Sequence, residues 1–171
     1  MEITTQNLER RKQNSEMAFQ IRPLALDHLD AVLAIQASSP EAAQWSRESY
    51  AWFLEKREEA AERLAWAAEC AGEVAGFLLA SRLRDEMEIL NLAVTATGRR
   101  RGTGIRLVDF ALRVARQKDV AHVFLEVRES NAAAVALYQR AGFEISHRRE
   151  NYYRDPPETA LVMTRKLGAA I

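Results

Sequence analysis

Three glycines and three arginines lie between a short apolar stretch and a long helical pattern. The glycines are Gly98, Gly102 and Gly104, and the arginines are Arg99, Arg100 and Arg101. Glycine lets the backbone turn tightly and approach a ligand, and the first N–H groups of a helix have no acceptor within the helix. These N–H donors and the positive helix end attract anions. The stretch therefore predicts a pyrophosphate-binding loop that leads into a helix near Thr103.

Two common nucleotide motifs do not fit this loop. A P-loop requires Gly-Lys-Ser/Thr, but Gly102 is followed by Thr103 and Gly104 without a lysine. The dinucleotide fingerprint requires a third glycine three positions after Gly104, where this chain has Leu107. A glycine-rich turn with solvated arginines remains the alternative interpretation of the loop taken alone.

A single carboxylate interrupts an apolar stretch further along the chain. Glu126 follows Val123, Phe124 and Leu125 and precedes Val127. Placing a carboxylate among such neighbours is costly unless it is hydrogen-bonded or has a task. Glu126 could act as a general base, or it could be a strand-end glutamate that reaches solvent or pairs with Arg128. The residues alone leave both interpretations open.

Tyr138 lies seven residues after Asn131, which is two helical turns, so both are expected on one side of a helix. The Tyr138 phenol could donate a proton to a leaving group, or it could be a core side chain with a hydrated hydroxyl group. Asn131 has the side chain of a helix N-cap.

The periodicity of apolar residues predicts an α/β chain in the order βααβββαβαββ, with a mixed sheet. Expected strands are Phe19 to Pro23, Arg63 to Ala68, Val74 to Ser81, Met87 to Val94, Val120 to Arg128, Phe143 to Tyr153 and Ala160 to Lys166. Expected helices run from an Asp27 cap to Ala37, from Ser46 to Arg57, onward from Thr103, and from Ala132 to Arg140. Residues 1–17 are expected to form a flexible extension and 18–171 a single domain.

Composition excludes several classes of protein. The chain has 171 residues, and its 24 Lys and Arg balance 24 Asp and Glu, so net charge does not favour nucleic acid as a partner. The lone Cys70 excludes an internal disulfide, and three scattered histidines do not predict a metal site. Without a signal segment or a long apolar run, the expected location is the cytoplasm, away from membranes. We expect a monomer or a weak dimer.

Several motifs occur together in order. They are Asn91-Leu-Ala-Val94, Arg99-Arg-Arg-Gly-Thr-Gly104, Leu125-Glu-Val-Arg128, Ser130-Asn-Ala-Ala-Ala-Val-Ala-Leu-Tyr138, Gly142-Phe143 and Asn151-Tyr-Tyr153. This set resembles the GNAT N-acetyltransferases, whose acetyl-coenzyme A (acetyl-CoA) loop reads Gln/Arg-x-x-Gly-x-Gly/Ala, and within them the RimI-type N-terminal protein acetyltransferases. The resemblance implies the GNAT fold, a mixed central sheet of about seven strands flanked by about four helices.

The resemblance also implies roles for individual residues. Glu126 would be the general base and Tyr138 the general acid in direct acetyl transfer from acetyl-CoA. Cofactor contacts would come from Leu92, Ala93, Val94, Arg99, Arg100, Arg101, Gly102, Thr103, Gly104, Ile105 and Asn131. The peptide would be bound by Asn151, Tyr152 and Tyr153. The acceptor would be a protein N-terminus, with a ribosomal protein as a candidate, and no metal is expected.

Two departures from the family pattern affect substrate recognition. The chain reads Gln44-Trp45-Ser46 where the family has Pro-Trp-Ser, and Thr159 replaces an acidic residue of the last strand. Two other functions therefore stay open at this point. One is a GNAT acetyltransferase of a small-molecule amine, and the other is a catalytically silent module that binds coenzyme A.

Overall fold

A seven-stranded sheet organises the chain, and its strands lie in the order β1-β2-β3-β4-β5-β7-β6. The computed structural model describes residues 19–55, 60–99 and 101–168. The strands are β1 (Phe19–Pro23), β2 (Glu62–Cys70), β3 (Glu73–Leu83), β4 (Glu86–Val94), β5 (His122–Arg128), β6 (Glu144–Arg154) and β7 (Pro157–Lys166). The helices are η1 (Leu26–His28), a 3₁₀ turn, and α2 (Leu29–Ala37), α3 (Arg47–Leu54), α4 (Thr103–Gln117) and α5 (Ala132–Arg140).

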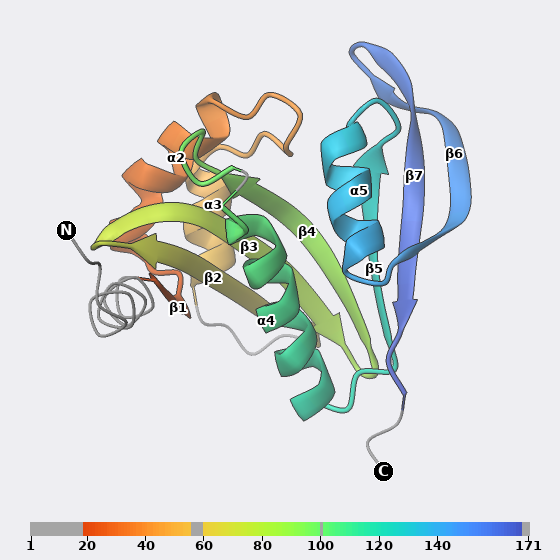
Figure 1. Cartoon of the computed structure of the whole chain (residues 1–171), viewed down its shortest axis with the longest axis horizontal. Coiled ribbons are helices and arrows are strands. Elements are labelled where there is room, and N and C mark those ends of the chain that lie inside the picture. The colour runs from red at the N-terminus through yellow and green to blue at the C-terminus, as the bar shows by residue number, and fades with distance from the viewer. Residues whose placement is uncertain (1–18, 56–59, 100, 169–171) are drawn as a thin grey trace, which may run out of the picture.

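Helices cover both faces of the sheet (Figure 1). Successive side chains of a strand point to opposite faces, so β3 contributes to two separate cores. Phe77 and Leu79 join a cluster with α2 and α3, whereas Leu78 and Ala80 join a larger cluster with α4 and α5. Both faces are therefore buried over β3, which explains its nearly continuous apolar sequence.

The pairing of β4 with β5 is parallel, and it stops at Ile89 opposite Leu125. Beyond this point β4 continues beside β3 to Val94, while β5 continues beside β7 to Arg128. The two strands consequently diverge, as Figure 1 shows. Divergence leaves one edge of each strand available to a ligand, because main-chain groups at that edge lose their ladder partners.

The expected α/β class, element order and GNAT-type sheet are confirmed. The cap assigned to Asp27 is wrong, because the chain begins this segment with the 3₁₀ turn η1, where the Ala25 N–H donates to His28 Nδ1 at 3.1 Å. Helix α3 ends earlier than expected, because Glu55 already has an extended backbone. The last strand begins at Pro157, three residues before its predicted start.

The predicted extension over residues 1–17 lies outside the described residues, as does Arg57. Among the helices of the described chain, none is long and apolar enough to cross a membrane.

Candidate active site

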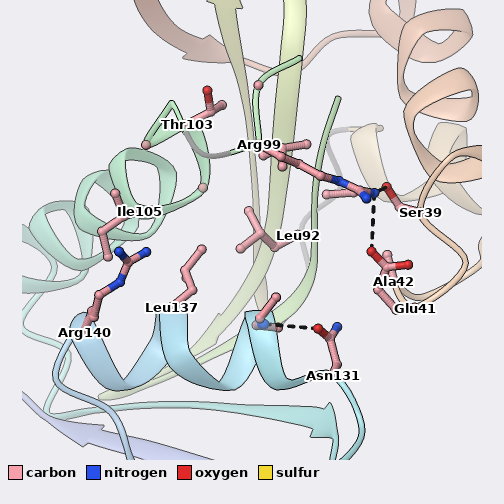
Figure 2. Close-up of a pocket in the computed structure, with 17 residues that line it drawn as sticks. Ser39, Glu41, Ala42, Leu92, Arg99, Thr103, Ile105, Asn131, Leu137 and Arg140 are labelled. Carbon is pink, nitrogen blue, oxygen red and sulfur yellow. Dashed lines mark hydrogen bonds and ion pairs between the residues drawn. The ribbon is translucent and has the colours of Figure 1, made fainter. Parts of the chain in front are cut away.

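A cavity of about 700 Å³ opens where β4 and β5 diverge (Figure 2). Four separate segments of the chain build its wall: the connection between α2 and α3, the end of β4, the loop into α4, and α5. The lining residues are Ser39, Glu41, Ala42, Leu92, Ala93, Val94, Gly98, Arg99, Gly102, Thr103, Gly104, Ile105, Asn131, Ala133, Ala134, Leu137 and Arg140. The size is that of a small-molecule or cofactor site.

The glycine loop ends at the N-terminus of α4, on the cavity wall. Gly102 is the N-cap, with φ of 79°, a left-handed conformation that favours glycine. Gly104 is needed for a different reason, because a Cβ atom there would lie 2.8 Å from Leu137 Cδ1 of α5. The loop therefore turns sharply while α4 and α5 pack closely, and the free N–H groups of the first turn of α4 are held at the cavity.

Of the three consecutive arginines, the structure places Arg99 on the cavity. Its Nη2 atom donates to the Ser38 carbonyl at 3.0 Å and to Ser39 Oγ at 2.9 Å, and lies 3.4 Å from Glu41 Oε1. Arg101 instead lines a neighbouring pocket of about 390 Å³ together with Arg106. Arg100 lies outside the described residues.

Asn131 occupies the position expected of a helix cap. Its side-chain oxygen accepts a 3.1 Å hydrogen bond from the Ala134 N–H, at the start of α5. Asn131 also lines the cavity, as Figure 2 shows. A role in capping and a contact with a ligand are therefore compatible.

Glu126 lies on β5 and forms an ion pair with Arg149 of β6, with 2.6 Å between Oε1 and Nη1. Its side chain is 19% exposed. The alternative partner considered from the sequence, Arg128, instead pairs with Glu158 at 3.0 Å. A hydrogen bond to Glu126 is also the main cause that raises the pKa of Tyr152. Glu126 is thus a mostly buried carboxylate held by two side chains of β6.

Tyr138 is buried on α5, beside the cavity but not among its lining residues. Its ring packs edge-on against Phe143, with 5.8 Å between ring centroids. Burial raises the pKa of the phenol well above its ordinary value, so the hydroxyl keeps its proton at neutral pH. A protonated hydroxyl is a requirement for a proton donor, and its role as the acid stays a prediction.

The three residues assigned to the peptide lie on β6 beside Glu126. Asn151 has φ of 53°, a left-handed conformation that asparagine tolerates. Tyr152 is exposed, and its ring meets that of Tyr153 edge-on at 5.3 Å. The Arg128 guanidinium lies 4.0 Å from the Tyr153 ring centroid. Together they form an aromatic surface on the outside of the sheet.

Sequence reasoning missed two charged residues of this region, Glu88 and Arg149. Glu88 lies one position before the end of the β4–β5 pairing, and its pKa is raised, first by burial and then by the charge of Glu126. The signal available in the sequence was a carboxylate within an alternating apolar strand, Met87-Glu88-Ile89.

Within the described ranges, no group of three or more His, Cys, Asp or Glu side chains is placed to hold a metal ion.

The diverging strands, the glycine loop at the start of α4 and the cavity between them define an acyl-coenzyme A-dependent transferase. Residues 29–143 match the acetyltransferase (GNAT) family, and the chain belongs to this family.

Two individual proteins show which members of the family this chain is similar to. The [ribosomal protein bS18]-alanine N-acetyltransferase of Escherichia coli (strain K12) is 38% identical over 94 residues, which cover 54% of this chain and 64% of that enzyme. This alignment therefore spans less than two thirds of the relative. A Bacillus subtilis (strain 168) protein, for which the same activity has been suggested, is 32% identical over 143 residues, covering 84% of this chain and 92% of its own length.

Solved structures agree with this placement. The crystal structure of the ribosomal-protein-S18-alanine N-acetyltransferase from Escherichia coli has a TM-score of 0.77 and 30% identity, covering 90% of this chain and 96% of that one. Ard1 from Thermoplasma volcanium has a TM-score of 0.78 and 30% identity, covering 88% of this chain and 99% of that one.

Proposed function

We propose that this protein transfers an acetyl group from acetyl-CoA to the α-amine at the N-terminus of a protein, with a ribosomal protein as the leading candidate. The observation that carries the proposal is the cavity lined by the end of β4, beyond its last pair with β5, together with the first turn of α4 and with α5. The alanine N-acetyltransferase activity in the name of the Escherichia coli relative supports the choice of acceptor.

The cavity has the chemistry that acetyl-CoA requires. N–H groups of the first turn of α4 and the Arg99 guanidinium are donors for a diphosphate. The divergent edge of β4, from Leu92 to Val94, offers main-chain groups to the amides of a pantetheine arm. Apolar side chains such as Ile105 and Leu137 cover the rest of the wall. The residues therefore fit an elongated ligand with an anionic end and an amide-rich arm.

The proposed chemistry assigns one task to each group. When bound, acetyl-CoA supplies an activated thioester carbonyl. Glu126, directly or through a water, accepts a proton from the acceptor ammonium, whose ordinary pKa of about 7.7–8.0 makes a carboxylate base sufficient. An N–H group of Leu92 to Val94 stabilises the negative charge on the carbonyl oxygen. The neutral amine forms the new C–N bond at the carbonyl carbon as the C–S bond breaks, and Tyr138 gives its proton to the departing thiolate. The second proton that the amine nitrogen loses on becoming the amide restores the Tyr138 hydroxyl.

Direct transfer agrees with the position of the cysteine. Cys70 lies exposed at the end of β2 and lines the neighbouring smaller pocket, and it is not among the residues that line the main cavity. A covalent acyl-enzyme would need a nucleophile beside the thioester, with a base to activate it.

Two substitutions test the chemical step. Glu126→Gln and Tyr138→Phe are each expected to lower kcat by about 10²-fold or more, because each removes a positioned proton-transfer group. Binding of acetyl-CoA, measured by calorimetry, should stay near the wild-type value in both variants. Wild-type turnover in both variants across pH would contradict the assignment of base and acid.

A panel of acceptors tests the substrate class. Short peptides that start with Ala or Met are compared with polyamines, amino acids and aminoglycosides at equal concentration. The proposal expects the peptides to be acetylated at the α-amine, as mass spectrometry would locate the added group. Acetylation of a small amine in preference to every peptide would favour the alternative enzyme, and tight acetyl-CoA binding without any acetylated product would favour a silent binding module.

A further inference from the structure

Glu88 and Glu126 lie on the same face of two adjacent strands. The parallel register pairs Glu88 with Phe124, and Glu126 is two residues further along β5. Phe124 and Glu126 lie on the face of β5 opposite to Val123 and Leu125, which are in the core with α4 and α5. On β4, Met87 and Ile89 belong to that same core, so Glu88 also points to the opposite face.

The spacing of the two carboxylates suits one small cation. In a regular ladder, two residues along a strand and one strand across correspond to a Cα–Cα separation of about 8 Å, and the separation is larger here because β4 and β5 diverge beyond Ile89 and Leu125. Two glutamate side chains at that separation can both reach a single ammonium group placed between them. Glu126 is 19% exposed and Glu88 is partly buried, and the pKa of Glu88 is raised first by burial and then by the charge of Glu126, so a cation between the two carboxylates would be favoured.

The charged and titratable groups around the pair come from β6. Arg149 binds Glu126 and lowers the pKa of Glu88, although less than burial and Glu126 raise it. Hydrogen bonding to Glu126 is the main cause that raises the pKa of Tyr152, and the pKa of Tyr153 is raised first by burial, with the charge of Glu126 as a smaller cause. One guanidinium therefore faces two carboxylates, and the local net charge is about −1.

The surroundings of Arg149 allow its side chain to leave Glu126. Its side chain is 49% exposed, and it reaches Glu126 from the edge strand of the sheet. The register of β6 against β7 shifts twice, between Ile145 and His147 and again between Arg149 and Tyr153. A half-exposed arginine beside an irregular stretch of an edge strand can leave its partner at low cost, because water can solvate the guanidinium.

We propose that Glu88 and Glu126 form a two-carboxylate seat for the charged amine of the acceptor, and that Arg149 occupies this seat until the acceptor displaces it. The inference rests on the proposed function and deepens it, since the seat selects acceptors that carry a free ammonium group. Once Glu126 has taken the proton and the amine has become an amide, the acceptor no longer carries a cation. After Glu126 has passed this proton to solvent, Arg149 returns to the ionised carboxylate, which favours release of the product.

The proposal predicts opposite effects on the peptide KM when a carboxylate of the seat is removed and when Arg149 is removed. With an amidated Ala-starting tetrapeptide, Glu88→Gln should raise the peptide KM about tenfold while kcat changes less, since one carboxylate remains for proton transfer. Arg149→Ala should lower the peptide KM severalfold, because the internal competitor is gone, and Arg149→Lys should behave more like wild type. Glu86→Gln is the matched control, because Glu86 is an exposed carboxylate on the same strand.

Peptide binding measured without turnover tests the seat independently of the chemical step. Calorimetry with coenzyme A present should show the free-amine peptide bound by the wild type and about tenfold more weakly by Glu88→Gln, and its N-acetylated form bound weakly by both. If the wild type acetylates the peptide but Glu88→Gln keeps the wild-type KM, or if Arg149→Ala raises it, the seat is wrong while the proposed function stands. A wild type that neither binds nor acetylates any peptide overturns both.

Discussion

Arg99 Nη2 lies 2.9 Å from Ser39 Oγ, although 60 residues separate the two along the chain. The contact joins the glycine loop before α4 to the segment between α2 and α3. The other end of that segment is held by Gln36, whose side-chain oxygen accepts from the Trp45 N–H at 2.8 Å. One wall of the cavity is therefore fixed by hydrogen bonds at both of its ends.

Arg99→Ala should weaken acetyl-CoA binding by about tenfold, because a charge-assisted hydrogen bond contributes roughly 1.5–3 kcal/mol and the anchor to Ser39 is lost with it. Arg99→Lys should recover part of the affinity, since lysine keeps the charge but not the planar fork. Calorimetric Kd values measure the effect. Arg116→Ala, on an exposed position in the last turn of α4, is the control. Equal Kd values for Arg99→Ala and this control would exclude Arg99 from the site.

Gly104→Ala should destabilise the protein by at most about 1 kcal/mol, because the added methyl group would lie 2.8 Å from Leu137 Cδ1, the end of a partly exposed side chain that has to shift. The clash should disappear in the Leu137→Ala background. There, Gly104→Ala should be neutral or stabilising by about 0.5–1 kcal/mol, since alanine is the better helix residue. Urea unfolding of the four proteins of this cycle measures the coupling. Additive effects would mean that α4 and α5 do not meet through these residues.

Local patterns were sufficient for the elements, and the family resemblance supplied the residues assigned to the cofactor. The Ser130-Asn131 cap and the αL glycines at 102 and 142 have local causes, and each is found in the structure. Nine of the eleven residues assigned to the cofactor line the cavity, because a strand, a glycine loop and a helix cap have fixed relative positions in this fold.

Contacts between side chains on different strands could not be predicted from local patterns. Arg149 is 23 residues from Glu126, and its pairing depends on how β6 folds back over β7. The sequence offered Arg128, two positions away, as the nearer partner. The sequence did not predict a role for Glu88 for a similar reason, since the proposed role depends on the register between β4 and β5. Long-range register leaves little trace in a single sequence.

Asn131→Ala should cost about 1 kcal/mol of stability, because the Ala134 N–H loses its cap. Asn131→Ser should keep most of that stability, since serine is an equally good cap. If Asn131 also contacts the cofactor, both variants should bind acetyl-CoA more weakly. Asn131→Ser would then keep the stability of the wild type but lose part of its affinity for acetyl-CoA. Thermal unfolding and calorimetry on the same preparations check this. Wild-type affinity in Asn131→Ser would restrict Asn131 to its role as a cap.

Tyr50 lies fully buried among polar groups of the α2–α3 face. Its hydroxyl donates to Gln36 Oε1 at 2.6 Å and accepts from Asn91 Nδ2 at 3.0 Å. Asn91 Nδ2 also reaches the Ala43 carbonyl, whereas Asn91 Oδ1 is buried without a hydrogen-bond partner. Burial raises the pKa of Tyr50 to about 12, and the hydrogen bond from Asn91 opposes the shift.

Stability should therefore fall as pH rises from about 10 to about 12. Over this range the unfolded chain releases the Tyr50 proton while the folded chain keeps it, so the free energy of unfolding falls by about 1 kcal/mol per pH unit. Below about pH 10 this contribution is complete. Tyr50→Phe should be less stable by about 1–3 kcal/mol at neutral pH, where Gln36 and Asn91 lose a partner, and should show a shallower alkaline slope. Urea unfolding at several pH values measures both. Parallel curves for Tyr50→Phe and wild type would show that Tyr50 ionises as readily in the folded state as in the unfolded chain.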